Sequence, residues 1–220
     1  MAKSKIDELN ILSADDGFED SENLFDYHSF IEHYFDPMQI NKKQKQERIE
    51  AAEEIFDAIL LFLIWCENAP ERVEEEATIR SFENMYKEVI FQYSEPDEYL
   101  DKYVVFFINN LIKVTMEHPK EEYFTSVERA ANVAANEANT VINHKELEDA
   151  KLLGFTKKRW LTELDDRVRE THQEMEGVTI PIDDLFLVGE SLMEMPKDSS
   201  HGADPKEIVN CRCVLEYLKD

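Results

Sequence analysis

Two cysteines separated by one residue, Cys211 and Cys213, are the side chains in this sequence best suited to chemistry. The chain has three cysteines, an odd number that favours a reducing compartment over the disulfide framework of a secreted domain. Two neighbouring thiolates could bind a soft metal such as zinc, with His172 and either Asp165 or His201 completing four ligands. Structural zinc sites usually space their cysteines by two to four residues, so this spacing is a weak metal signal.

Two other roles remain open for the cysteine pair. A disulfide across one intervening residue would be strained and would need an oxidising setting. In a strand, Cys211 and Cys213 would share one face for packing, and Arg212 would point to the other face. The chain contains no pattern typical of a hydrolase nucleophile, a phosphate-binding loop or a helical H-E-x-x-H metal site.

A second polar group, Asp165, Arg167, Arg169 and His172, precedes the cysteines. Separations of four and three residues would place Asp165, Arg169 and His172 on one face of a helix, which we expect at about residues 157–174. Such a set is either a surface ion pair or a partly buried network in which arginine bridges carboxylates and backbone carbonyls.

The region that must position these groups is helical. No glycine occurs from Asn41 to Leu153, and the prolines Pro70, Pro96 and Pro119 divide this stretch. Proline is tolerated in the first turn of a helix and breaks its interior. The sequence therefore predicts four long helices, at about residues 42–68, 70–93, 97–117 and 121–152. The last of them carries a stripe of mostly small residues that predicts close helix packing: Phe124, Val127, Ala131, Ala134, Ala138 and Val141.

Composition divides the chain into three parts and predicts an α+β fold. Residues 1–40 are acidic, and we expect them to be partly mobile, with an aromatic-rich segment at 23–35 forming a short helix that docks on the body or on a partner. Residues 41–153 form the helical region. Residues 154–220 carry four of the five glycines and short apolar patches, which predict a small mixed domain with short strands.

Net charge excludes several classes of function. The formal charge of −25 argues against direct binding of nucleic acid, because such a surface repels phosphates at long range. The N-terminus has no apolar run of signal-peptide length, so we expect no secretory leader. The most apolar run, Ile55–Trp65, is too short to cross a bilayer, and we expect no membrane association.

Taken in order, the C-terminal motifs resemble the signature of phage head morphogenesis proteins, the minor head protein family typified by phage Mu protein F and the SPP1 minor head protein. That signature joins a K-x-W, a D-x-R-x-R-x-x-H, a glycine before an apolar strand and a closing N-C-R-C. A helix before it carries a glutamate and an asparagine six residues later. The matching residues are Glu137, Asn143, Lys158, Trp160, Asp165, Arg167, Arg169, His172, Gly177, Asn210, Cys211, Arg212 and Cys213. Family members commonly have an arginine where this chain has Ala135.

The resemblance implies a non-enzymatic structural role in head assembly, with the portal and capsid proteins as partners and no cofactor. It also implies a location in the virion, and in the host cytoplasm during assembly. Two alternatives come from other classes. A nucleotide-modifying, toxin-like module would use Glu137 with Arg129 or Arg169, and a small metal-binding adaptor would hold zinc through His172, Cys211 and Cys213.

Overall fold

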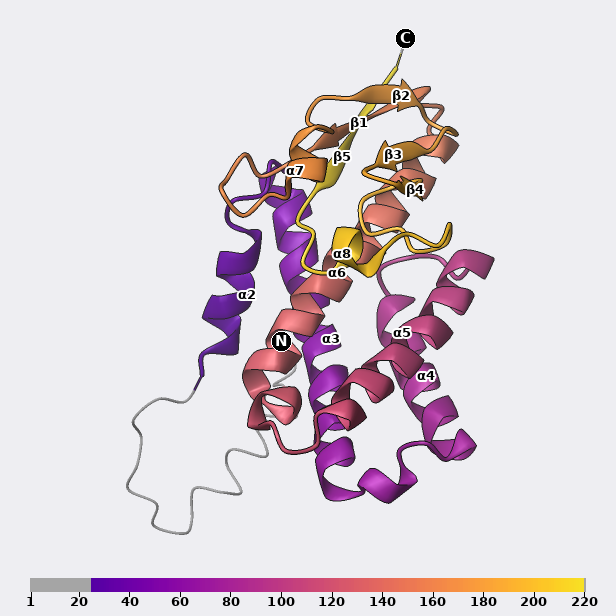
Figure 1. Cartoon of the computed structure of the whole chain (residues 1–220). Helices are drawn as coiled ribbons and strands as arrows, with labels where there is room; N and C mark the ends of the chain where they lie inside the picture. Colours follow the sequence, from indigo (N-terminus) through magenta and orange to yellow (C-terminus); the bar gives the residue numbers. More distant parts are fainter. Residues whose placement is uncertain (1–24, 220) are drawn as a thin grey trace.

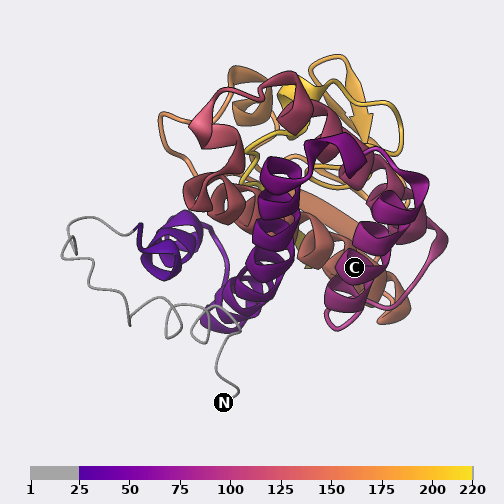
Figure 2. The ribbon, with the colours of Figure 1, turned by 90° about the horizontal axis from the view of Figure 1, so that it is seen from below.

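The computed structural model describes residues 25–219 as a helical body with short strands gathered at one end (Figure 1). Helix α3 has α2 on one side and the α4–α5 pair on the other (Figures 1 and 2). The helices of this body are α2 (Tyr27–Phe35), α3 (Lys42–Asn68), α4 (Glu76–Ile90), α5 (Glu98–Glu117) and α6 (Val127–Leu152), with 3-10 turns η1 (Pro70–Arg72) and η2 (Glu122–Thr125). The four predicted long helices are thus confirmed. The expected mobility of the first twenty or so residues lies outside the described part of the chain.

Local sequence signals begin and separate these helices. Asn41, Asp97 and Ser126 each accept a hydrogen bond from a backbone N–H in the first turn of α3, α5 and α6. These caps satisfy donors that have no partner within the helix. Pro70 opens η1, and the predicted helix at 70–93 begins only at residue 76 because the chain first makes this 3-10 turn.

Helix α6 packs along α3 and belongs to both hydrophobic cores of the chain. Its buried alanines, among them Ala131, Ala134 and Ala138, line the helical core and allow the two helices to approach closely. Its last turns contribute Leu147 and Ala150 to a second core under the strands. Because one rigid helix serves both cores, it fixes the position of the strands relative to the helical body.

The C-terminal part is built on a three-stranded antiparallel sheet of order β2-β1-β5 and a separate β3-β4 hairpin. Its elements are β1 (Lys157–Leu161), α7 (Glu170–Gln173), β2 (Thr179–Pro181), β3 (Phe186–Val188), β4 (Ser191–Met193), α8 (Pro205–Ile208) and β5 (Val214–Leu218). The α+β class is therefore confirmed. Among the described residues, no helix is both long and apolar enough to span a bilayer.

The prediction of a helix at about residues 157–174 is wrong. Residues Lys157–Leu161 form β1, which is the central strand, and only Glu170–Gln173 is helical. Lys158 and Trp160 are fully buried on one face of this strand. Pairing with β5, more than fifty residues later, stabilises the strand, and a local helical spacing does not register that partner.

One buried guanidinium joins the helical body to the last strand. Arg48 of α3 is fully buried; its Nε donates to Asn139 Oδ1 at 3.0 Å, and its Nη2 donates to Asn143 Oδ1 at 2.9 Å. It also forms an ion pair with Glu146 at 2.8 Å. The planar group of arginine can satisfy several acceptors at once, which a lysine cannot do in this geometry.

We expect Arg48→Met to lower the free energy of unfolding by about 3–5 kcal/mol, because it removes the ion-pair partner of Glu146 and the donors to the Oδ1 atoms of two buried asparagines. Urea unfolding followed by circular dichroism measures the change. Arg80→Met, which removes an arginine from the exposed face of α4, is the control. Equal stability of the two variants would contradict this role of Arg48.

Candidate functional site

The N-C-R-C segment lies directly before β5 and is held by α6. Asn139 Nδ2 donates to the carbonyl oxygens of Cys211 and Cys213 at 3.4 and 3.3 Å, and Asn143 Nδ2 donates to that of Cys213 at 3.2 Å. The same two asparagines accept from Arg48. Through their hydrogen bonds, the two asparagines therefore fix the backbone of the cysteines relative to α3 and α6.

Asn210 turns the chain into this segment. Its φ of 55° lies in the left-handed region, where asparagine is among the few residues other than glycine that are found regularly. Its Oδ1 accepts from Asn136 Nδ2 of α6 at 2.7 Å. Both the backbone conformation and the side-chain contact thus suit asparagine at this position.

The two cysteines and His172 form a compact buried centre. Cys211 Sγ and Cys213 Sγ lie 3.6 and 3.4 Å from His172 Nδ1, and all three residues are at most 3% exposed. The one ligand atom that each residue offers lies within 4.8 Å of the other two. The three cysteines of the chain, all in the described part, are free thiols. The centre therefore has the donor set of a soft metal site, with three protein ligands.

Burial and hydrogen bonds set the charge of this centre. Burial alone would raise the pKa of Cys211, but hydrogen bonds from Cys213 and His172 hold it well below its usual value. Its hydrogen bond to Cys211, together with burial, raises the pKa of Cys213 well above the usual value. Burial would lower the pKa of His172, and the neighbouring Cys211 outweighs burial and raises it. Of the two thiols, Cys211 is therefore the one that loses its proton more readily.

A buried carboxylate lies close to the other ring nitrogen of His172. Nε2 lies 3.2 Å from Glu207 Oε2, and Glu207 accepts from Thr171 Oγ1 at 2.7 Å. Glu207 is 2% exposed, on α8. Among the described residues Nε2 has no hydrogen-bond partner, so Glu207 acts on His172 through its charge and raises the pKa of the imidazole.

Asp165 and the arginines form a second network beside this centre, and they do not share a helix face. Asp165 accepts from Arg212 Nη2 with both oxygens, at 2.9 and 2.8 Å, and from Arg167 Nη2 at 3.1 Å. Arg169 donates to the carbonyl of Val209. The prediction that Asp165, Arg169 and His172 share one face of a helix is wrong, because only Glu170–Gln173 is helical in this region. Asp165 and Arg169 instead contact residues in and next to the N-C-R-C segment.

The remaining signature residues support this arrangement. Trp160 is fully buried, and its ring centroid lies 5.1 Å from Phe186 and 5.7 Å from His172, edge to face in both pairs. Gly177 has a φ of 74° and donates its N–H to the carbonyl of Trp160, a turn that favours glycine. Trp160 therefore forms one wall behind the imidazole.

Glu137 belongs to a different, interior network. Its Oε2 accepts from Tyr86 and Tyr103 hydroxyls at 2.9 and 2.7 Å, and burial raises its pKa. Arg129 lies eight residues earlier on α6, about 12 Å along the axis. Arg169 contacts the N-C-R-C side instead. The structure does not bring Glu137 together with either arginine by any described contact.

Sequence reasoning missed Arg48, Glu163 and Glu207. Glu163 is 8% exposed, neither carboxylate oxygen has a hydrogen-bond partner among the described residues, and it lines a small cavity with His172 and both cysteines. The only sequence signal for it was its position between Trp160 and Asp165. Nothing local in the sequence distinguishes Arg48 or Glu207 from the other charged residues of their helices.

Comparisons with known proteins relate part of this chain to one family and one curated protein. Residues 108–216, from within α5 to within β5, match the family model described as Phage Mu protein F like protein. The chain is also 35% identical over 104 residues to the NAD(+)–arginine ADP-ribosyltransferase EFV of Enterococcus faecalis; that match covers 46% of this chain and 21% of the relative. No solved structure matches the chain.

The matched residues include the long helix α6 and most of the small sheet, and the match confirms the resemblance to phage head morphogenesis proteins that the sequence indicated. Through residues 108–216, about half of its length, the chain belongs to the phage Mu protein F-like family.

Burial raises the pKa of the Glu163 carboxyl from 4.5 to about 7. The folded protein therefore binds this proton more tightly than the unfolded chain, and the free energy of unfolding should fall as pH rises through that window. We expect Glu163→Gln, a neutral isostere, to be more stable than the wild type at about pH 8 and similar to it at about pH 5.

Urea unfolding across this pH range, in a chelating buffer that keeps metal out of the centre, measures the effect. Glu174→Gln removes an exposed carboxylate just after α7 and is the matched control. Parallel pH profiles for Glu163→Gln and the wild type would contradict the assignment.

Proposed function

We propose that this protein is a minor head protein of a tailed phage or prophage, present in a few copies near the portal and acting in head assembly without enzymatic activity. The observation that carries the proposal is the family match over residues 108–216, which includes the Cys–His centre and the neighbouring contact of Asp165 with Arg212. The family indicates a virion protein. We propose the portal and capsid proteins as its partners in the head.

The helical body offers surface for such partners. Apolar side chains remain exposed on α3 and α5, including Trp65 at 38% and Phe106 at 54%. Surface apolar residues of this size are the usual anchors of protein contacts. With a net charge of −25, the rest of the surface is repelled by packaged DNA, which suits a protein that contacts other proteins inside a head.

The similarity to an ADP-ribosyltransferase is the comparison that relates to the enzymatic alternative, and it is a partial match. The match covers 21% of that protein, so its named activity can lie outside the shared part. Within this chain, Glu137 is bound by Tyr86 and Tyr103, away from Arg129 and Arg169. This geometry supports a structural role for Glu137. Unchanged host viability on expression, with or without Glu137→Ala, is the result expected from the structural proposal.

A second candidate function is the binding of zinc at the Cys–His centre. Three donor atoms within 4.8 Å of one another and the carboxylate of Glu207, 3.2 Å from His172 Nε2, support it. Glu163 or a water molecule would be the fourth ligand. Bound zinc would hold the N-C-R-C segment against α7 and would stabilise the domain rather than catalyse a reaction.

We expect the protein to co-purify with the portal protein of its phage and to be present in particles in a few copies. Quantitative mass spectrometry of purified particles gives the copy number, and a pull-down against portal and major capsid proteins gives the partner. The double variant Cys211→Ser/Cys213→Ser should reduce incorporation because it loosens the network. Absence of the wild-type protein from both particle and portal would refute the proposed function.

For the metal, we expect protein purified without a histidine tag to contain one zinc per chain, and the cobalt-substituted protein to show thiolate-to-cobalt charge-transfer absorption. Cys211→Ser or Cys213→Ser should abolish this absorption and lower the thermal midpoint. His201→Ala is the control, since His201 is 41% exposed beside Asp198. If the wild-type protein contains no metal, or if the double cysteine variant retains it, the proposal of a zinc site at the Cys–His centre is refuted.

A further inference from the structure

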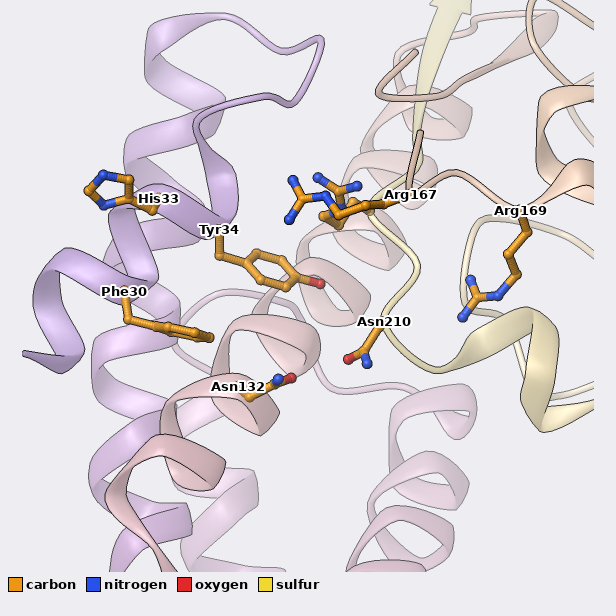
Figure 3. Close-up of a pocket in the computed structure, with 8 residues that line it drawn as sticks. Phe30, His33, Tyr34, Asn132, Arg167, Arg169 and Asn210 are labelled. Atoms are coloured by element: carbon orange, nitrogen blue, oxygen red, sulfur yellow. The ribbon is translucent and has the colours of Figure 1, made fainter. Parts of the chain in front are cut away.

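A cavity of about 450 Å³ lies between α2 and the signature loops, outside the Cys–His centre. Its volume is within the range of roughly 300–1,000 Å³ typical of small-molecule sites. We call it the arginine pocket, and its lining consists of Phe30, His33, Tyr34, Asn132, Arg167, Arg169, Asn210 and Arg212. Figure 3 shows Phe30 and Tyr34 on one side, Arg167, Arg169 and Asn210 on the other, and Asn132 on α6 between them.

The pocket concentrates positive charge in a strongly acidic protein. Three guanidinium groups line it, and the carboxylate bound to them is that of Asp165, which Arg212 and Arg167 share. Two of these arginines have side-chain N–H groups that are not fully used by partners in the described residues. Arg212 Nη1 is buried without a partner among the described residues, and the side chain of Arg167 is 69% exposed. The exposed guanidinium of Arg167 can bind an anion that enters the pocket, and the charge of Arg212 adds to the attraction.

The opposite wall is aromatic and carries neutral polar groups. Phe30 and Tyr34 lie one turn apart on α2 and present their rings to the cavity (Figure 3). The hydroxyl of Tyr34 is buried and has no hydrogen-bond partner among the described residues. Asn132 and Asn210 add amide groups at the rim. Arginine donors opposite aromatic rings suit a ligand that has both a phosphate and a planar apolar group.

We propose that the arginine pocket binds a small phosphorylated ligand of the nucleoside phosphate class. The guanidinium groups of Arg167, Arg169 and Arg212 would hold the phosphate, and Phe30 and Tyr34 would contact the base. A long nucleic acid is the less suitable occupant, because the net charge of −25 repels a polyanion while an enclosed arginine cluster still attracts one phosphate group.

The pocket would couple parts of the chain that lie far apart in the sequence. Its aromatic wall belongs to α2, its arginines to the loop before α7 and to the N-C-R-C segment. A bound phosphate would therefore join α2 to the family signature. This binding is independent of the proposed place of the protein in the head, so either proposal can fail without the other.

The test is isothermal titration calorimetry of the full chain at low salt with inorganic phosphate, ribose 5-phosphate and adenosine monophosphate. We expect adenosine monophosphate to bind more tightly than ribose 5-phosphate, because the base adds contact with the aromatic wall. Arg167→Gln and Arg169→Gln should each weaken binding about tenfold, as expected when one charge-assisted hydrogen bond is lost. Phe30→Leu should reduce only the preference for the nucleotide.

Arg159→Gln is the matched control, because Arg159 lies on β1, pairs with Glu216 and lies outside the pocket lining. Thermal unfolding of every variant checks that it folds. Several results would overturn the proposal: no binding of the three small ligands, equal weakening by Arg159→Gln, or binding of a 5′-phosphorylated oligonucleotide without binding of the mononucleotide. Equal affinity for phosphate and mononucleotide would remove the nucleoside part of it.

Discussion

The hydrogen bonds of the buried Arg48 guanidinium are the interaction on which the rest of the structure depends. They fix Asn139 and Asn143 on α6, and these amides in turn bind the backbone carbonyls of Cys211 and Cys213. Each nitrogen of the Arg48 guanidinium has an acceptor, so the geometry of α3, α6 and the N-C-R-C segment is set as one unit. Close helix contact through the alanines of α6 allows the arginine to reach that far.

The Cys–His centre and the arginine network are possible because this unit holds the chain in an otherwise unfavourable arrangement. Two thiols, an imidazole and the carboxylate of Glu207 share one buried volume, and Glu163 is buried beside them without a hydrogen bond from any residue of 25–219. Each of these groups would lose hydration free energy there, and mutual contacts compensate for part of the loss. An arrangement of this kind is more typical of a site under functional constraint than of a surface selected for stability alone.

The family relationship and the geometry point to one division of roles within the chain. The signature residues are mostly interior, where they hold the small sheet against α6, while exposed apolar side chains such as Phe106 lie on the helical body. The arginine pocket lies where α2 meets the signature, at the junction of these two regions.

The sequence by itself determined the helical part of the fold and the family to which the C-terminal signature belongs. Proline positions, the absence of glycine over residues 41–153 and the alanine stripe depend on local backbone and packing preferences, which are legible in one chain. Only the tertiary structure decided that Lys157–Leu161 is a strand, that Asp165 pairs with Arg212, and that Arg48 and Glu207 complete the site. These contacts join residues that are far apart along the chain, and their stability comes from a shared buried environment that exists only once the chain has folded.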